Sequence, residues 1–419
     1  MSLGRRLPLR AVIAWAIGPV IATTLCACHS DPPPPSHAVT RDSAGIQIVE
    51  STVPLGAEYV PWTIDTVPLI DLGARQDDPH EEFSGTVAPR RLGDGQIVVA
   101  TSGASELRFF DSTGVWIRSV GRAGQGPGEF QSLGWLAVGP GDTLRTYDWS
   151  LRRLSVFTPA GTFVRSYLLA SPGVERGAIP RAVLADGTIL VSGTPFIRPG
   201  HPSGVARDTA PLLLYGMTGA VVDSFGRFPG SEALIEGTEN SVTVMDCPFG
   251  KDLAIAVPRT YDAIYLGSED APEVTVWTPT GHLTRILRWQ APPVAVTDKD
   301  RTAYLESMTQ GARPGQEEFQ RRLQRMVQQA ALPLQKPAYA GLVPGSNGTI
   351  WIQTYTAPDL IAATPFQVFD STGQWLGTLT LPARFTARQI GEDFILGTWQ
   401  DRDDVDHVRL YRLSRRRPS

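Results

Sequence analysis

The stretch Leu107-Arg-Phe-Phe-Asp-Ser-Thr-Gly114 recurs almost unchanged as Phe366-Gln-Val-Phe-Asp-Ser-Thr-Gly373, more than 250 residues later. Three further stretches of the same form end at Gly161, Gly219 and Gly281, and each has an aromatic residue four positions before the glycine. The alternation of apolar and polar residues predicts a half-buried strand. The glycine supplies the positive φ that a tight hairpin turn requires. The chain is therefore expected to consist largely of repeated hairpins.

A second repeated pattern consists of a polar turn followed by a run rich in β-branched residues. It occurs six times, beginning at Asp94, Asp142, Asp186, Asp252, Asn347 and Asp393. Three of the five gaps match the roughly 40–50 residues of one propeller blade. We therefore expect an all-β fold, a six-bladed β-propeller over residues 42–415. The two wider gaps are expected to contain insertions, a loop at residues 194–210 and a longer piece at residues 292–338.

The longer insertion has the only strong helical pattern in the chain. Thr297-Asp-Lys-Asp resembles a helix start, and the stretch after Pro314-Gly315 repeats apolar residues at helical spacing. The apolar residues of that second segment are Phe319, Leu323, Met326, Val327 and Ala330. We expect a helical hairpin docked on the propeller through this stripe. The alternative is an exposed helix that binds a partner.

The sixth repeat stops before a final strand, so an N-terminal strand is expected to close the last blade. One candidate is Ile46-Gln-Ile-Val49, which follows a turn, Asp42-Ser-Ala-Gly45, similar to residues 370–373. The other is the segment at residues 67–72, followed by residues 73–83, which resemble residues 121–130. Both alternatives remain open. Either strand would remove exposed sheet edges by joining the two ends of the chain.

The N-terminus has the features of an export signal. Arg5, Arg6 and Arg10 precede an apolar run at residues 11–25. The following Leu25-Cys-Ala-Cys28 resembles a bacterial lipobox, which implies lipidation of Cys28 after removal of residues 1–27. Residues 28–41, with four consecutive prolines, are expected to form an extended tether. The membrane is thus an expected partner, and His29 after Cys28 resembles the sorting signal for the periplasmic face of the outer membrane.

Composition narrows the function further. The chain has 419 residues and a formal net charge of −4, which gives no basis for nucleic-acid binding, and we expect a monomer. Three cysteines cannot form a disulfide scaffold. Once Cys26 is removed and Cys28 is lipidated, Cys247 stands alone, and we interpret it as a small buried hydrophobic residue.

Gly121-Arg-Ala-Gly-Gln-Gly-Pro-Gly-Glu-Phe130 resembles the signature of NHL-repeat six-bladed propellers. From Asp42-Ser-Ala-Gly-Ile-Gln-Ile-Val-Glu50 onward, the chain is similar to a group of bacterial NHL-like propeller lipoproteins. This resemblance implies the fold but specifies no activity.

Two sets of polar residues are candidates for a site in the central channel. Glu82 and Glu129 each precede a phenylalanine in a loop that enters an innermost strand, and Glu239 is a third such candidate. One expectation is that Glu82 and Glu129 together hold Ca²⁺, which prefers oxygen ligands. The alternative is that they cap backbone donors of the loop. Arg90, Arg181 and Arg388 are placed on predicted innermost strands, where they would favour an anionic ligand.

Two functions follow from these candidates. The first is a propeller that binds a protein, peptide or glycan outside the cytoplasm, without a cofactor. The alternative is a metal-dependent hydrolase or lyase with Ca²⁺ at the channel mouth. The sequence contains no Gly-x-Ser-x-Gly, no phosphate-binding loop and no His-Glu-x-x-His pattern, and so displays none of these three catalytic motifs.

Overall fold

The computed structural model describes residues 37–56, 59–60, 62–75, 77–170, 177–193, 197–310, 317–356 and 362–415, and the statements below refer to these residues. The expected signal peptide, Cys28 and residues 28–36 of the expected tether lie outside this range. Residues 38–41, which were assigned to the tether, belong instead to strand β1 (Ala38–Ser43). The β structure thus begins a few residues before the predicted boundary at residue 42.

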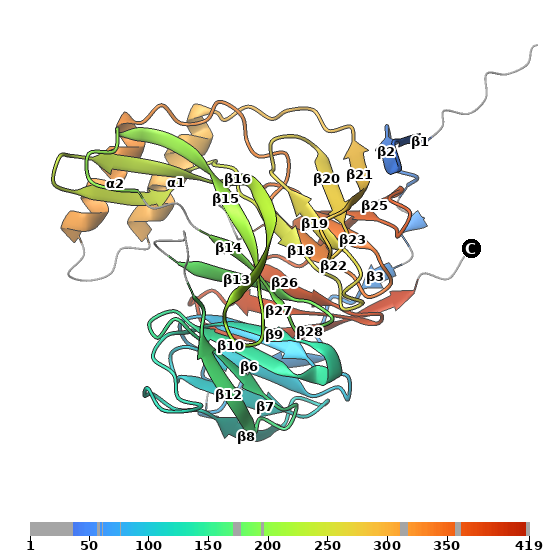
Figure 1. Cartoon of the computed structure of the whole chain (residues 1–419), viewed down its shortest axis with the longest axis vertical. Helices are drawn as coiled ribbons and strands as arrows, with labels where there is room; N and C mark the ends of the chain where they lie inside the picture. Colours follow the sequence, from blue (N-terminus) through green and yellow to red (C-terminus); the bar gives the residue numbers. More distant parts are fainter. Residues whose placement is uncertain are drawn as a thin grey trace, which may run out of the picture. The chain divides into compact units, whose positions relative to one another are not determined.

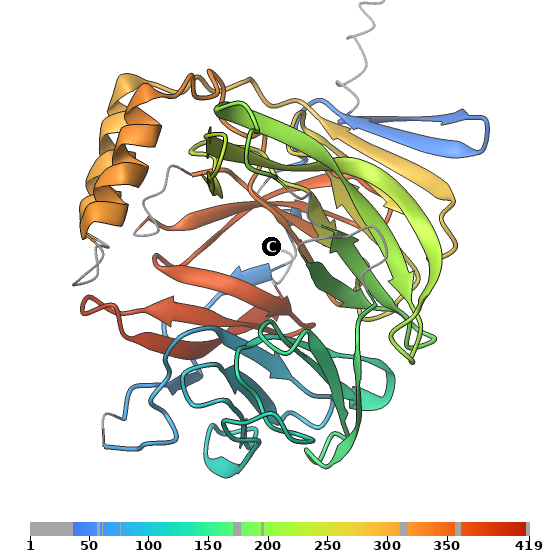
Figure 2. The same ribbon diagram turned by 60° about the vertical axis from the view of Figure 1, so that its left-hand side comes forward.

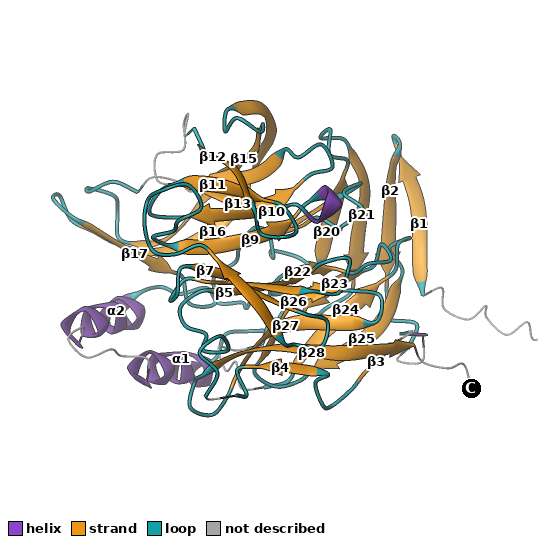
Figure 3. Ribbon diagram, turned by 90° about the horizontal axis from the view of Figure 1, so that it is seen from below, coloured by secondary structure: helices purple, strands orange, loops and turns teal. Residues whose placement is uncertain are grey.

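Within the described ranges the strands form six sheets, numbered here in chain order (Figures 1 and 3). Sheet 1 contains β5 (Val87–Arg91), β6 (Ile97–Thr101), β7 (Glu106–Phe110) and β8 (Trp116–Val120). Sheet 2 contains β9 (Leu133–Val138), β10 (Leu144–Asp148), β11 (Arg153–Phe157) and β12 (Phe163–Leu168). Sheet 3 contains β13 (Ala178–Val183), β14 (Ile189–Gly193), β15 (Gly204–Tyr215), β16 (Val221–Gly237) and β17 (Val242–Asp246).

The second half of the chain forms the other three sheets. Sheet 4 contains β18 (Ala254–Ala256), β19 (Ile264–Gly267), β20 (Glu273–Trp277) and β21 (Leu283–Trp289), extended by β2 (Ile46–Ser51) and β1. Sheet 5 contains β22 (Leu342–Pro344), β23 (Ile350–Gln353), β24 (Thr364–Phe369) and β25 (Trp375–Leu381). Sheet 6 contains β26 (Phe385–Ile390), β27 (Phe394–Gln400) and β28 (Asp406–Arg415), extended by β3 (Trp62–Ile64) and β4 (Ile70–Leu72).

The hairpin turns follow the chemistry that the repeated sequence predicted. In the turn between β7 and β8, the Asp111 carboxylate accepts hydrogen bonds from the backbone N–H groups of Thr113 and Val115, at 2.8 and 2.9 Å. Gly114 has φ +87°, a conformation that costs other residues energy. The turn between β24 and β25 repeats this arrangement with Asp370 and Gly373.

The first strands of the six sheets follow one another in a ring. β5 lies against β9, β9 against β13, β13 against β18, β18 against β22, β22 against β26, and β26 returns to β5. A buried apolar cluster lies between each pair of neighbouring sheets. Between sheets 6 and 1, for example, Leu396 and Val408 pack with Val99 and Phe110, all fully buried. Burial of apolar surface between sheets is the main stabilising term for such an arrangement.

Two N-terminal segments join sheets that are formed mainly by later residues. β4 pairs antiparallel with β28, with Leu72 opposite Val408, and β3 also pairs antiparallel with β28. The segment at residues 67–72 is therefore the one that extends sheet 6, through its residues 70–72. The other candidate, within β2, pairs in parallel with β21 of sheet 4.

One of the six repeated turns is not equivalent to the others. The sequence pattern grouped the turn at Asp252 with that at Asp94, which precedes the second strand of sheet 1. The turn at Asp252 precedes the first strand of sheet 4, β18, and the second strand, β19, follows a turn at residues 258–262. The apolar run Leu253-Ala-Ile-Ala-Val257 reads equally well as either strand.

The insertion at residues 292–338 contains helices α1 (Asp298–Gln310) and α2 (Glu317–Gln329), which lie side by side (Figure 2). Thr297 and Asp300 form a capping box, because each side chain accepts a hydrogen bond from the other residue's backbone N–H. In the described chain, no helix is long and apolar enough to cross a membrane.

The apolar stripe of α2 is docked only in part. Met326 and Val327 are buried against Leu234 and Phe249, whereas Phe319 at the start of α2 is 52% exposed. The surface that receives α2 belongs to the long strands of sheet 3 and the segment after them. Residues 204–210, expected to form a loop, lie in β15 and pair with β16.

Candidate functional site

A cavity of about 720 Å³ lies where the first strands of the six sheets meet. Its wall is formed by the C-terminal parts of these strands and by the turns that follow them. Every sheet contributes: residues 90–95 from sheet 1, 137–138 from sheet 2, 181–183 from sheet 3, 255–257 from sheet 4, 342–346 from sheet 5 and 387–392 from sheet 6. We call this cavity the central pocket.

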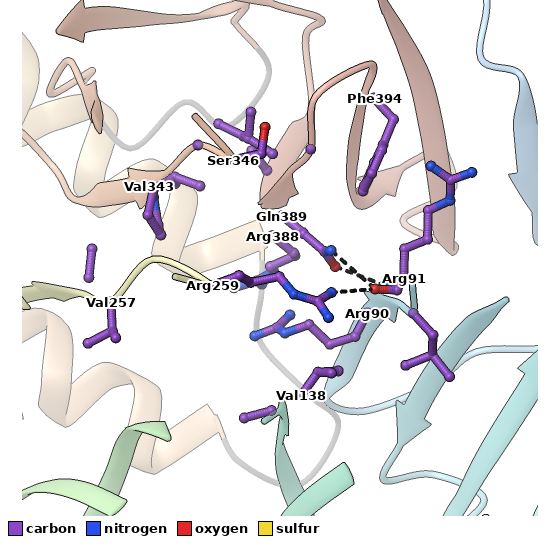
Figure 4. Close-up of a pocket in the computed structure, with 18 of the residues that line it drawn as sticks. Arg90, Arg91, Val138, Val257, Arg259, Val343, Ser346, Arg388, Gln389 and Phe394 are labelled. Atoms are coloured by element: carbon purple, nitrogen blue, oxygen red, sulfur yellow. Dashed lines mark hydrogen bonds between the residues drawn. The ribbon is translucent and has the colours of Figure 1, made fainter. Parts of the chain in front are cut away.

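Three arginines that the sequence placed on innermost strands line the central pocket. Arg90 lies on β5, Arg181 on β13 and Arg388 on β26, so three different sheets supply them. Arg90 Nη1 donates to the carbonyl of Pro89 at 2.8 Å, and Arg181 Nε donates to Ser192 Oγ at 2.7 Å. No described carboxylate lies within ion-pair distance of any of the three. Figure 4 shows Arg90 and Arg388 in the pocket together with Arg259.

The surroundings disfavour the charged form of these guanidinium groups. Burial, followed by the positive charges of Arg388 and Arg259, lowers the pKa of Arg90 to about 10. Burial also lowers the pKa of Arg181 and of Arg388, against smaller opposing effects of Asp252 and Asp406. Arg90 remains cationic at neutral pH, because a pKa of about 10 is far above 7. An anion that entered the pocket would relieve this unfavourable concentration of positive charge.

Carboxylates are fewer than arginines along the wall and lie at its exposed turns. Arg91 and Arg259 also line the pocket, which therefore has five arginines. Its lining contains two acidic residues, Asp94 and Glu392. Both acidic residues are exposed, and the Asp94 carboxylate accepts hydrogen bonds from the backbone and side-chain nitrogens of Gln96. The central pocket is therefore positive in a protein whose net charge is negative.

The turn between β18 and β19 reaches from sheet 4 to sheets 1 and 2. Arg259 Nη1 donates to the carbonyl of Arg91 at 3.0 Å, and Nη2 forms a 2.6 Å ion pair with Asp142. Tyr261 Oη donates to the carbonyl of Val138 at 3.1 Å. These contacts fix the turn along one side of the pocket, and Figure 4 shows the bond from Arg259 to Arg91. Arg259 could not be predicted from the sequence, because its role depends on contacts across more than 100 residues.

A second basic residue that the sequence analysis missed lies behind the pocket wall. Arg145 on β10 is 6% exposed, and its Nε and Nη1 atoms have no hydrogen-bond partner. Its guanidinium fits against Gly139 and Gly187, where a β-carbon would stand within 3.0 Å of it. Burial lowers the pKa of Arg145. Its uncompensated charge adds to the positive field of the neighbouring pocket.

The glutamates expected at the channel mouth lie elsewhere. Glu82 and Glu129 precede the first strands β5 and β9, whereas the central pocket is lined by the opposite ends of these strands. Glu239 is exposed at the turn between β16 and β17, and none of the three lines the pocket.

The two aligned glutamates differ in what they do. Glu129 accepts hydrogen bonds from Gly126 N–H and Arg122 Nε, both at 2.7 Å, and these contacts hold its pKa below the usual range. The Glu82 side chain is exposed, and it is the backbone carbonyl of Glu82 that accepts a hydrogen bond, from Arg108 Nη1. The carboxylate that caps this loop belongs to the buried Glu81, which binds Gly73 N–H and Arg75. The similarity of residues 73–83 to residues 121–130 predicts the correct loop, but the carboxylate that caps it belongs to Glu81 and not to Glu82.

These arrangements do not suit a calcium ion. The Glu129 carboxylate is already engaged with Arg122, and the Glu82 side chain faces solvent. Among the described residues, no group of three or more His, Cys, Asp and Glu side chains is placed to hold a metal.

Cys247 is buried, and burial raises the pKa of its thiol to about 12, which keeps it protonated and unreactive.

Comparison with known proteins identifies a shared fold. A member of the DUF4221 family from Bacteroides vulgatus matches with a TM-score of 0.52 and 11% identity, over 85% of this chain and 98% of that chain. An exported protein from Bacteroides fragilis matches with a TM-score of 0.48 and 10% identity, over 88% and 99% of the two chains. A streptogramin B lyase matches with a TM-score of 0.39 and 11% identity, over 86% and 100%.

The first of these likenesses shows that the chain has a propeller-type β fold, and fold alone does not assign an activity. No protein-family model and no curated protein matches the sequence.

Proposed function

We propose that this protein is an exported, lipid-anchored six-bladed β-propeller, similar to NHL-like lipoproteins, that binds an anionic ligand in its central pocket. The closed propeller is supported by the ring of first strands and by the apolar cluster between each pair of neighbouring sheets. Six blades account for the six sheets of the described chain.

The observation that carries the binding function is the set of three guanidinium groups without carboxylate partners. Arg90, Arg181 and Arg388 come from blades that are far apart in the sequence. Uncompensated positive charges in a recessed pocket destabilise the empty protein, and an anionic ligand offsets that cost. Guanidinium groups bind carboxylate, sulfate and phosphate oxygens through paired hydrogen bonds. The ligand is a small molecule or part of a peptide, protein or glycan that bears such a group.

Thermal unfolding in sulfate and in chloride at equal ionic strength tests this function. Sulfate is expected to raise the melting temperature of the wild type, because a ligand that binds only the folded state stabilises it. Arg388→Ala and Arg181→Ala should lose this increment. The matched control is Arg118→Ala, since Arg118 stacks on Phe109 and donates to the Ala160 carbonyl outside the pocket.

An increment in the two pocket variants equal to that of the wild type would exclude the arginines as the anion site. An increment lost equally in Arg118→Ala would show that the loss is not specific to the arginines of the pocket.

The proposed location has its own experiment. Export followed by lipidation of Cys28 would place the propeller on the periplasmic face of the outer membrane. Cys28→Ser should move the protein from the membrane fraction to the soluble periplasmic fraction. Retention of the variant in the membrane fraction would exclude the lipid anchor, without affecting the pocket.

A further inference from the structure

We propose that the ligand of the central pocket is an amphipathic carboxylate, meaning a carboxylate group on an apolar body, and not a polyhydroxylated glycan. This inference rests on the proposed anion-binding function and narrows it to one class of ligand. It depends on which polar groups of the pocket are free and on the nature of the rest of its wall.

Two of the neutral polar side chains at the wall, Gln389 and Tyr261, are already bonded within the protein, whereas Ser112 and Ser346 lie at exposed turns. Gln389 Oε1 accepts from Arg91 N–H at 2.9 Å, and Gln389 Nε2 donates to the Arg91 carbonyl at 3.2 Å. The Tyr261 hydroxyl donates to the Val138 carbonyl. A glycan requires many neutral hydrogen-bonding partners, and a hydroxyl buried without one costs free energy. Apart from these two serines, the polar side chains that can bind a ligand are mainly the charged guanidinium groups.

Between the arginines, the wall carries many aliphatic side chains. They come from five of the six sheets and include Val138, Val183, Ile255, Val257, Val343 and Ile390. A surface of this kind stabilises an apolar body by roughly 25 cal/mol for each Å² removed from water. It gives no such gain to a hydrophilic anion such as phosphate.

The size of the pocket agrees with such a ligand. A volume of about 720 Å³ lies within the range of roughly 300–1,000 Å³ found for sites of drug-sized ligands. The positive charges of Arg388 and Arg259 act on Arg90, so these three groups mark one polar region, and the aliphatic wall away from them is left for the body. An aliphatic acid and the C-terminal residues of an apolar peptide both have this chemistry.

Isothermal titration of the full chain carrying Cys28→Ser distinguishes these ligands. The carboxylate probes are dodecanoate, below its micellar concentration, and N-acetyl-trileucine with a free C-terminus. The comparison probes are the C-terminal amide of the same peptide, galacturonate and inorganic phosphate. At least one carboxylate probe is expected to bind ten or more times tighter than galacturonate and phosphate. Arg388→Ala should weaken that probe tenfold or more, whereas Arg118→Ala should not.

Each outcome decides the proposal. Binding of dodecanoate alone or of the peptide alone supports it and identifies a free acid or a chain end as the source of the carboxylate. Equal binding of the peptide acid and its amide would overturn it, as would galacturonate or phosphate binding as tightly as the carboxylate probes. Failure of both carboxylate probes would overturn it too. Should Arg388→Ala not fold, Arg388→Gln replaces it.

The sulfate experiment separates this proposal from the underlying function. If sulfate stabilisation depends on Arg181 and Arg388 while neither amphipathic carboxylate binds, the anion site stands and only the ligand class is wrong. If sulfate stabilisation does not depend on these arginines, the proposed function itself fails.

Discussion

His407 Nδ1 lies 2.8 Å from Asp71 Oδ1, so the last strand of the chain is joined through side chains to a strand near its beginning. Arg409 Nε and Nη2 contact the other oxygen of Asp71, at 3.0 and 2.8 Å. Arg409 also stacks over Trp399, with Cζ 3.2 Å from the centre of the ring. These contacts lie beside the backbone pairing of β4 with β28. Joining of the chain ends within one sheet is how propellers avoid an open edge.

Asp71→Ala is expected to lower the free energy of unfolding by about 2 kcal/mol, because it leaves the largely buried Arg409 and His407 without their acceptor. Urea denaturation measures this change. Asp77→Ala, at an exposed carboxylate in the same N-terminal region, should change the free energy of unfolding by no more than about 0.5 kcal/mol. Equal effects of the two substitutions would show that Asp71 has no special part in joining β4 to β28.

Two buried arginines in neighbouring sheets should respond differently to replacement by methionine. Arg108 on β7 is 7% exposed and donates to the carbonyls of His80 and Glu82, at 3.0 and 2.6 Å. Arg108→Met should therefore lower the free energy of unfolding by about 2 kcal/mol. Arg145 has unpartnered nitrogens, so Arg145→Met should leave stability unchanged or raise it. A loss for Arg145→Met as large as that for Arg108→Met would contradict the assignment of Arg145 as uncompensated.

Glu269 should make the protein less stable as the pH rises. It is 5% exposed, and burial raises the pKa of its carboxyl from 4.5 to about 8, against the opposing hydrogen bond from Asp252 N–H. The folded state therefore holds a proton that the unfolded state releases at lower pH, and stability falls between about pH 4.5 and pH 8.

Glu269→Gln should flatten this dependence when the free energy of unfolding is measured at pH 5, 6.5 and 8. Glu306→Gln, at an exposed position on α1, should keep the wild-type slope. A wild-type slope in Glu269→Gln would exclude Glu269 as the responsible group.

The sequence predicted those features that depend on a few neighbouring residues. The Asp-Ser-Thr-Gly turns at Gly114 and Gly373 formed as expected, because the aspartate bonds backbone groups only two to four residues ahead. The alternation of polar and apolar residues likewise placed Arg90, Arg181 and Arg388 on first strands. A period-2 pattern is enough to assign a face of a strand.

Features that depend on distant contacts were missed or misassigned. Arg259 acts through Asp142 and the Arg91 carbonyl, which no local pattern connects to it. Glu81 and Glu82 are adjacent, and only the folded loop shows that Glu81 turns inward to Gly73. The turn at Asp252 was grouped with turns at a different position because the apolar run at residues 253–257 reads equally well as a first or a second strand.

A crystal soaked in selenate, a sulfate analogue with an anomalous signal, tests the central claim most directly. The account predicts an anomalous peak in the central pocket, with selenate oxygens within hydrogen-bond distance of the guanidinium groups of at least two of Arg90, Arg181 and Arg388. Peaks only outside the pocket, with these side chains unoccupied at saturating selenate, would contradict it.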